Sequence, residues 1–260
     1  MPASDSAHLT STRDGRVLHL ALDRLDKKNA ITRAMYAALA DALADAADDA
    51  AVRVVVLSGR DGVFTAGNDL LDFMADPPTG PESPVFRFLM AAVGFPKPLV
   101  VAVEGPAIGI GTTILLHADL VYAASDARLQ MPFATLGLVP EAASSLLLPR
   151  LAGHVRAAEL LLFGEPFTAE TAREVGLVNE VVAPGEAVDR ALARAHQLAA
   201  LPPEAIRQTK ALLRRASAEP VAETIAHEGA LFVARLASPE AQEAFTAFFE
   251  KRPADFSSFE

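Results

Sequence analysis

Cysteine is absent from the 260-residue sequence, and this absence excludes several kinds of chemistry. Without thiols there are no disulfides, thiolate zinc sites, iron–sulfur clusters or cysteine nucleophiles. No apolar run approaches the ~20 residues needed to span a bilayer, and the polar residues 1–15 lack the apolar core of a signal peptide. We therefore expect a soluble, cytoplasmic protein with no membrane association.

Basic residues are also scarce, since 23 lysines and arginines face 33 acidic residues and give a formal net charge of −10. This surplus of negative charge disfavours binding to nucleic acid. Hydrophobic residues make up 51% of the chain and charged residues 22%, which is typical of a globular rather than a disordered protein. The length fits one large domain, with or without a small appendage.

No spacing typical of a metal site or a serine nucleophile is present. The histidines lack HxH and HExxH patterns, and Ser144-Ser145 lies outside a GxSxG elbow. The glycine-rich stretch from Gly105 to Gly111 lacks the Gly-Lys-Ser/Thr ending of a phosphate loop, so it is only a weak indication of one. We expect no metal.

The first half of the chain reads as alternating strands and helices. Residues 8–23 predict a hairpin, and Thr32 can cap the helix that follows. Residues 53–57 and 99–103 are apolar runs typical of buried parallel strands, with a helix expected over 83–94. This alternation indicates βαβ units and an α/β fold.

From about residue 142 the pattern becomes helical. We expect helices over 142–151, 153–163, 168–175, 186–200 and 203–216, and helical pieces over 219–250. The sequence therefore divides into an α/β core over residues 1–195 and a helical region over residues 196–260.

Two glycine-containing turns follow apolar strands and lead into helices. One lies in Phe64-Thr-Ala-Gly-Asn-Asp-Leu70 and the other in Gly105-Pro-Ala-Ile-Gly-Ile-Gly111. Such a turn leaves free backbone N–H groups at the positive end of a helix, and two of them aimed at one carbonyl oxygen form an oxyanion hole. The alternative is that both are ordinary turns in which glycine supplies a positive φ.

Five segments of the chain resemble the crotonase superfamily, the enoyl-CoA hydratase/isomerase group. They are residues 64–70, 97–111, 118–123, 132–141 and 162–182, which follow the order and spacing of that family over almost the whole chain. The resemblance implies an α/β fold built as a spiral of ββα units with a C-terminal helical trimerisation region. It also implies acyl-CoA thioesters as ligands.

The resemblance assigns roles to residues of both turns. The two oxyanion-hole donors fall on the backbone N–H groups of Asn68 and Ile110. Most relatives carry glycine at the second position, but a backbone donor needs no particular side chain. The CoA moiety is expected against the loop residues Lys28, Ala30, Ala66 and Gly67. The other expected substrate contacts are Asp69, Leu70, Gly109, Phe133 and Leu136.

The chain departs from the hydratase pattern at both of its acidic positions. Water addition needs a water held between two acidic groups, yet the matching positions are Thr113 and Phe133. Glu141 instead lies further along, a placement that resembles the peroxisomal-type Δ3,Δ2-enoyl-CoA isomerases, in which one glutamate carries out both proton transfers. The sequence alone also allows Glu141 to be a first-turn glutamate favoured by the helix dipole.

The predicted reaction moves a double bond of an acyl-CoA from C3 to C2. Glu141 takes a proton from C2 and returns one to C4, while the amides of Asn68 and Ile110 stabilise the dienolate oxygen. Apolar neighbours disfavour the charged form of Glu141 and make it a stronger base. CoA is part of the substrate, so no cofactor is expected. The alternatives are another crotonase-type reaction, such as hydration or CoA hydrolysis, and a non-catalytic acyl-CoA-binding protein.

Three other acids lie close to the predicted turns. Asp69 is best explained as the N-cap of the next helix, Glu104 ends a strand, and Glu165 lies in a turn. We therefore expect no acid–base role for any of the three.

The late helices carry many apolar residues. They are Ile206, Leu212, Leu213, Leu231, Phe232, Leu236, Phe245, Phe248 and Phe249. A terminal segment cannot bury this much apolar surface against itself, so we expect a homotrimer or a dimer of trimers. The resemblance implies that a neighbouring subunit contributes Phe249 and Lys251 to the CoA site.

Overall fold

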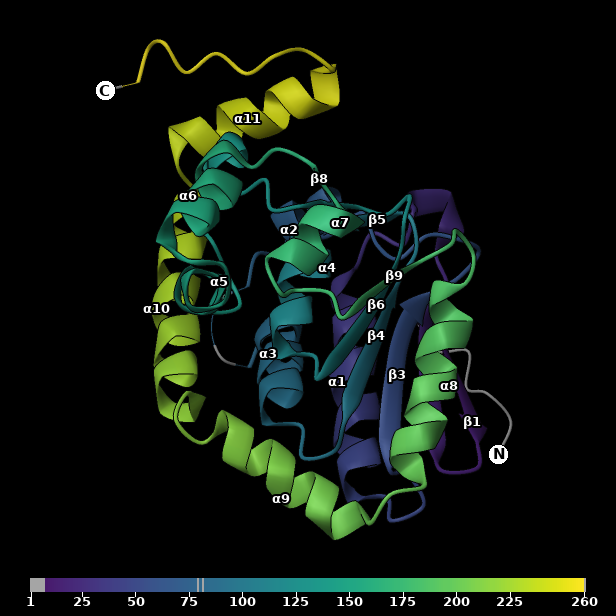
Figure 1. Cartoon of the computed structure of the whole chain (residues 1–260). Helices are drawn as coiled ribbons and strands as arrows, with labels where there is room; N and C mark the ends of the chain where they lie inside the picture. The colour runs from purple at the N-terminus through teal and green to yellow at the C-terminus, as the bar shows by residue number, and fades with distance from the viewer. Residues whose placement is uncertain (1–7, 79, 81, 260) are drawn as a thin grey trace.

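A six-stranded sheet runs through the middle of the molecule (Figure 1). The computed structural model describes residues 8–78, 80 and 82–259. The strand order is β1-β2-β3-β4-β6-β9; β1 and β2 pair antiparallel as the expected hairpin, and the other neighbours pair in parallel. The strands are β1 (Leu9–Asp14), β2 (Val17–Leu22), β3 (Val54–Gly59), β4 (Leu99–Val103), β6 (Leu120–Ala124) and β9 (Glu180–Val182). Both apolar runs are thus confirmed as buried parallel strands.

Three short strands form a second sheet. β5 (Pro106–Ile108) pairs in parallel with β7 (Arg128–Gln130), which pairs antiparallel with β8 (Phe167–Thr168). The chain after β3 reaches the same sheet through a bridge between Thr65 and Ala107. β3, β4 and β6 are therefore each followed by a segment of this second layer and then by a helix. This arrangement confirms the expected spiral of ββα units.

Helices cover both faces of the six-stranded sheet. α8 (Ala187–Ala199) lies along one face, where its buried side chains are all alanine and pack on valines of β2, β3 and β4. Small side chains let this helix lie close to the sheet. α1 (Arg33–Asp48) and α3 (Pro84–Gly94) cover the opposite face. Thr32 caps α1 as predicted, because its side-chain oxygen accepts from the Met35 amide at 3.3 Å.

The remaining helices surround this core. They are α2 (Leu70–Ala75), α4 (Ile110–Thr113), α5 (Ser144–Ala152), α6 (His154–Phe163), α7 (Ala169–Glu174), α9 (Pro203–Arg214), α10 (Ala218–Leu236) and α11 (Pro239–Glu250), with 3-10 turns η1 (Leu25–Lys27), η2 (Ile114–His117) and η3 (Ala134–Leu136). The helices expected after residue 142 are confirmed, with one correction. α5 begins at Ser144 rather than at residue 142, because Ala142 and Ala143 both adopt a positive φ, which no α-helix accommodates.

The C-terminal helices wrap one side of the molecule (Figure 1). α9 crosses below the sheet, α10 runs beside α5, and α11 lies across the end of α10. The division into residues 1–195 and 196–260 stays a prediction, and α8 runs across that boundary. Among the described residues, no helix is long and apolar enough to cross a membrane.

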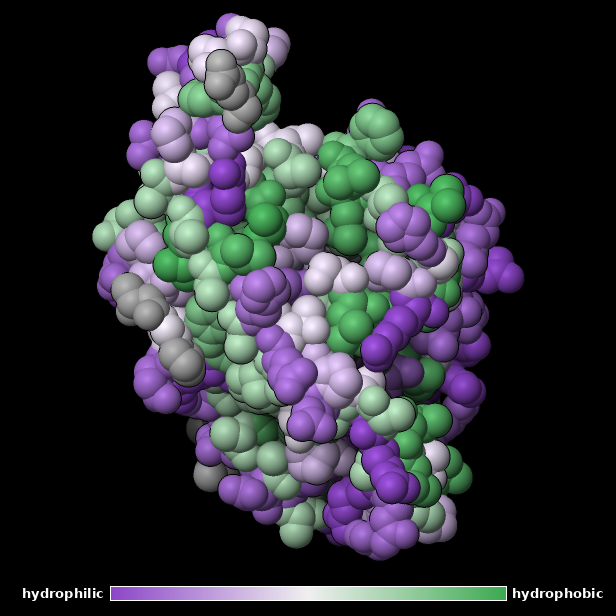
Figure 2. Space-filling model, turned by 90° about the vertical axis from the view of Figure 1, so that its left-hand side faces the viewer, coloured by the Kyte–Doolittle hydropathy of each residue, from purple (hydrophilic) through white to green (hydrophobic). Residues whose placement is uncertain are grey.

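The apolar residues of the late helices behave in two ways. Phe232 and Phe245 are buried within the chain itself, which corrects their assignment to an unpaired apolar surface. Leu212, Leu213 and Phe248 remain exposed, at 69%, 80% and 60%. Figure 2 looks onto the side that carries α5, α6 and α10 and shows apolar patches between polar side chains. Only part of the expected surface is therefore left for another subunit.

We predict that the protein associates through these exposed side chains, as a trimer or a dimer of trimers. Leaving large apolar groups of α9 and α11 in water is unfavourable, and a second subunit would cover them. Light scattering at micromolar concentration measures the mass directly. A monomer would contradict the prediction.

Candidate active site

The two glycine-containing turns lie side by side. The Thr65 amide donates to the Pro106 carbonyl at 2.9 Å, and the Ile108 amide donates back to the Thr65 carbonyl at 3.1 Å. The next residues stay close: a Cβ added at Gly67, whose φ is +88°, would lie 2.7 Å from the Ile108 carbonyl oxygen. Glycine is therefore needed at position 67 both for its φ and for this close approach.

Two backbone amides of these turns are free. The residues on either side of Asn68 bond to the loop at Ile31, since the Ile31 amide donates to the Gly67 carbonyl and the Asp69 amide donates to the Ile31 carbonyl. Successive N–H groups of an extended segment point in opposite directions, so the Asn68 amide faces away from that loop. Ile110 is the first residue of α4, where an amide has no partner inside the helix. Within the described chain neither amide donates a hydrogen bond to another protein group.

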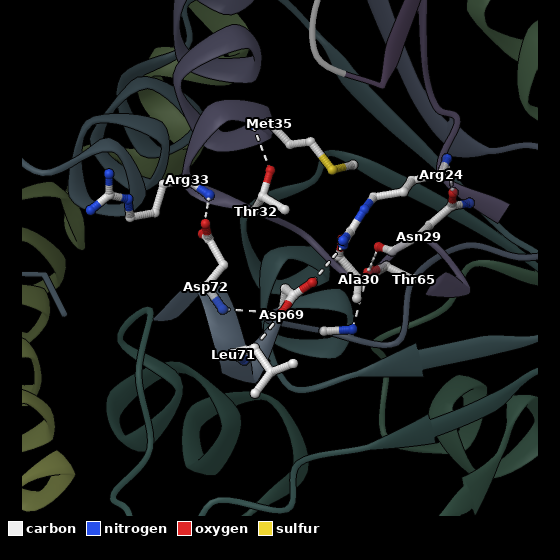
Figure 3. A network of polar contacts seen from close by, with 11 residues as sticks. Arg24, Asn29, Ala30, Thr32, Arg33, Met35, Thr65, Asp69, Leu71 and Asp72 are labelled. Atoms are coloured by element: carbon white, nitrogen blue, oxygen red, sulfur yellow. Dashed lines mark hydrogen bonds and ion pairs between the residues drawn. The ribbon is translucent and has the colours of Figure 1, made fainter. Parts of the chain in front are cut away.

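A polar network anchors the loop before α1 to the first turn (Figure 3). The Arg24 guanidinium donates to the Ala30 carbonyl at 2.8 Å and to the Asp69 carboxylate at 2.7 Å. The buried Asn29 side chain accepts from the Arg24 amide, and its backbone carbonyl accepts from the Thr65 hydroxyl at 2.6 Å. These bonds hold the loop in place beside the turn.

Asp69 is the N-cap of α2, as expected. Its carboxylate accepts from the amides of Leu71 and Asp72. Burial acts to raise the pKa of Asp69, but the Arg24 guanidinium and the two amides outweigh it and hold that pKa below its usual value. The carboxylate is thus ionised and occupied by structural partners.

The expected CoA-binding residues surround the same loop. Lys28 is exposed, has a φ of +50°, and accepts from the Ala66 amide through its carbonyl at 2.9 Å. Ala30 lies next to the bridge between Ile31 and Asn68. Leu70 is half-buried at the start of α2, and Gly109 precedes α4 with a φ of +56°. The loop and both turns therefore form one continuous edge.

An apolar cavity opens beside the first turn. Its lining comes from α1, α2, α3, α10 and the chain before α5, and consists of Tyr36, Asn68, Phe73, Pro78, Val85, Phe86, Leu89, Glu141, Ala142, Ile225, Gly229 and Phe232. Glu141 is the one acidic residue in this lining. Within the described chain no group of three or more His, Asp or Glu side chains could hold a metal ion.

Glu141 lines this cavity, and its side-chain partner among the described residues is the buried Thr113, whose hydroxyl donates to Oε1. Burial raises the pKa of Glu141 to about 8; the Thr113 hydrogen bond opposes this rise, and the negative charge of Glu228 adds to it. Thr113 is the position at which the hydratase pattern has an acid. Glu141 therefore contacts a neutral threonine at the position where the hydratase pattern has a second acid.

Other predicted residues lie outside the cavity lining. Phe133 is buried and packs edge-on against Phe232, with ring centroids 6.5 Å apart, so it supports the wall from behind. Leu136 lies in η3 and is half-buried. Glu104 is buried and accepts from the amides of Gly185 and Ala187, 3.0 and 2.7 Å away. These bonds cap the start of α8 and give Glu104 a structural role.

Tyr36 is a site residue that sequence reasoning missed. It is fully buried in α1, and its hydroxyl donates to the Asn68 side-chain oxygen at 2.5 Å. Burial and the charge of Glu141 raise the pKa of Tyr36 well above 10, so it stays a phenol and a hydrogen-bond donor. The sequence does contain a signal for Tyr36, because it lies on the apolar face of an amphipathic helix. A hydroxyl buried there needs a hydrogen-bond partner, which indicates a polar contact in the interior.

The sequence matches the family described as enoyl-CoA hydratase/isomerase over residues 12–258. The chain belongs to this family. Enoyl-CoA delta isomerase 2 of Rattus norvegicus is 35% identical over 257 residues, which cover 96% of this chain and 66% of the rat protein. The 2,3-dehydroadipyl-CoA hydratase of Escherichia coli K12 is 33% identical over 251 residues, which cover 96% and 98%. The chain thus spans about two thirds of the rat isomerase and nearly all of the bacterial hydratase.

Solved structures agree with this assignment. Pseudomonas aeruginosa OdaA is 49% identical with a TM-score of 0.91, over 94% of this chain and 99% of that chain. An enoyl-CoA hydratase/isomerase from Pseudoalteromonas atlantica T6c is 44% identical with a TM-score of 0.91, over 96% and 100%. The crotonase-type fold and the superfamily are therefore confirmed, and the named relatives include both isomerases and hydratases.

Replacing Thr113 by valine is expected to raise the pH at which Glu141 ionises. The threonine hydroxyl donates a hydrogen bond that stabilises the carboxylate form, and valine has no such donor. Valine keeps the shape of threonine, so the packing changes little. An infrared pH titration of the protonated-carboxyl band that Glu141→Gln removes measures the midpoint. The matched control is Thr112→Val, which removes a neighbouring buried hydroxyl bonded to the Ala107 carbonyl instead. An unchanged or lower Glu141 midpoint in Thr113→Val would contradict the hydrogen bond between Thr113 and Glu141.

Proposed function

We propose that the protein is an enoyl-CoA isomerase that converts a 3-enoyl-CoA to the trans-2-enoyl-CoA. The observation that carries the proposal is a single carboxylate, Glu141, in an apolar cavity that Asn68 also lines, with the turn of Ile110 paired to the turn of Asn68. The relatives named enoyl-CoA delta isomerase support the same reaction class. CoA enters as part of the substrate, and the chemistry needs no further cofactor.

The first step of the proposed mechanism is removal of a proton from C2 by the ionised Glu141. An apolar cavity favours this transfer, because a carboxylate with a raised pKa binds the proton more strongly than an exposed one. The electron pair left at C2 delocalises onto the thioester oxygen and gives a dienolate. The protonated Glu141 then returns a proton to C4, and the double bond lies between C2 and C3.

The amides of Asn68 and Ile110 are the proposed donors to the dienolate oxygen. Both belong to strand-to-helix turns held side by side by the Thr65 and Pro106 backbone, so both are fixed before substrate binds. Removing one donor of a well-formed oxyanion hole costs ~3–4 kcal/mol in the barrier. Tyr36 fixes the Asn68 side chain and thereby the orientation of its peptide.

The CoA moiety is proposed to bind along the edge formed by Lys28, Ala30, Ala66 and Gly67, with the acyl chain in the cavity. Phe73, Phe86 and Phe232 give this cavity an apolar wall suited to a hydrocarbon chain. Exposed Lys28 lies where it can meet a phosphate group.

Hydration is the second candidate, favoured by relatives such as the Escherichia coli hydratase. It needs a water held between two acids, whereas Thr113 and Phe133 cannot ionise. The two reactions separate in one assay, in which 3-enoyl-CoA and 2-enoyl-CoA are supplied in turn and isomerisation and water addition are followed separately. The proposal expects fast isomerisation and little hydration; efficient hydration would overturn it.

Replacing Glu141 by glutamine is expected to lower kcat for isomerisation by at least ~10⁴-fold, because one group both removes and returns the proton. KM should change little, since CoA is held elsewhere and glutamine keeps the volume. Steady-state kinetics with 3-enoyl-CoA gives both constants. The exposed Glu223→Gln serves as the control and should keep near-normal turnover. Near-normal turnover in Glu141→Gln together with its loss in Asp69→Asn would move the chemistry to the first turn.

The isomerase rate should depend on pH through the ionisation of Glu141. Only the carboxylate accepts a proton, and burial raises the pKa of Glu141 to about 8. Below that pH most of the enzyme carries a protonated Glu141, so kcat/KM should rise with pH and level off above about 8. A profile already flat from pH 6 upward would contradict this assignment of the base.

Gly229 is expected to set the width of the acyl cavity. A Cβ at this position of α10 would lie 2.5 Å from ring carbons of Phe86, so Gly229→Ala must displace that ring, which lines the cavity. We expect kcat/KM to fall ~10-fold more for long acyl chains than for short ones. A chain-length series measures this ratio, with the exposed Ala230→Ser as the control. Equal losses at every chain length would show that Gly229 does not limit the cavity.

A further inference from the structure

The backbone after Glu141 takes an unusual path. Ala142 and Ala143 have φ angles of +57° and +55°, and both side chains are buried. Two consecutive residues with a Cβ in this region are rare, and they persist only where the surroundings hold them. The turn therefore needs partners from outside itself.

Two side chains from other elements hold this turn. Glu228 of α10 is buried, at 4% exposure, and accepts from the Ala143 amide at 2.6 Å and from the Ser145 amide at 2.9 Å. His117 of η2 lies 2.7 Å from the Ala142 carbonyl through Nε2. Burial lowers the pKa of His117 to about 4, so the ring is neutral and donates this hydrogen bond.

The Glu228 carboxylate is also a charge beside the site. Each of its two oxygens accepts an N–H group, which is the pattern of an ionised carboxylate. Burial raises the pKa of Glu228, whereas the Ser145 and Ala143 donors and the charge of His227 lower it. Among the described residues, Tyr36 of α1 and Glu228 of α10 interact electrostatically with Glu141, and the neutral His117 of η2 bonds to the next residue, Ala142.

We propose that Glu228 is a positioning residue for the base: it holds the turn after Glu141 in its left-handed conformation, and its carboxylate places a negative charge next to that turn. The proposal rests on the proposed function only in its kinetic part. Glu228 itself does not line the cavity, so it acts through Glu141 rather than on the substrate.

The test uses Glu228→Gln in the full-length protein. Glutamine has one acceptor oxygen, so one of the two amides loses its partner and the turn loosens. We expect kcat for 3-enoyl-CoA to fall ~10- to 100-fold with little change in KM, because a small misplacement of the base is costly. With the negative charge gone, the midpoint of the kcat/KM profile should move to lower pH. The exposed Glu223→Gln on the same helix is the control and should change neither.

A second variant separates position from charge. Glycine adopts a positive φ without strain, so Ala143→Gly combined with Glu228→Gln should restore the turn. This double variant should regain most of the stability and part of kcat, yet keep the lowered pH midpoint. It also keeps the test available if Glu228→Gln alone folds poorly.

The infrared titration of Glu141 makes the result independent of activity. A lower Glu141 midpoint in Glu228→Gln supports the proposal even if the wild-type protein proves inactive on 3-enoyl-CoA, in which case the proposed function alone fails. An unchanged midpoint together with an unchanged kcat overturns the proposal. A loss of stability without any shift in midpoint overturns its electrostatic part and leaves Glu228 as a purely structural clamp.

Discussion

The candidate site depends on one backbone pairing, in which Thr65 exchanges hydrogen bonds with the segment from Pro106 to Ile108. This pairing places two strand-to-helix turns side by side, and Gly67 allows their backbones to touch. The free amides of Asn68 and Ile110 follow from it, because each is left without an acceptor where its strand ends. The network around Arg24 and the α2 cap then hold the same edge from the other side.

The groups around Glu141 determine how strongly this carboxylate binds a proton. Burial raises the pKa of Glu141, the hydrogen bond from the Thr113 hydroxyl lowers it, and the negative charge of Glu228 raises it further. A hydratase would need a second acid at the position of Thr113. With the neutral Thr113 at that position, Glu141 is the one acidic residue that lines the described cavity.

The sequence predicts those parts of the fold that depend on local pattern. The apolar run at residues 99–103 becomes β4 with the same bounds, and the helix caps at Thr32 and Asp69 are confirmed. Strands of two or three residues such as β8 have no periodicity to detect. Tyr36 and Glu228 were missed because their partners lie 32 and more than 80 residues away, and only the folded chain brings them together.

The most direct test of the single-carboxylate account follows the proton itself. The substrate is a 3-enoyl-CoA that carries deuterium at C2, and mass spectrometry and NMR locate the label in the product. If Glu141 carries the proton across a cavity with limited solvent exchange, part of the deuterium appears at C4. A product without label at C4, or label transfer that survives in Glu141→Gln, would contradict the account.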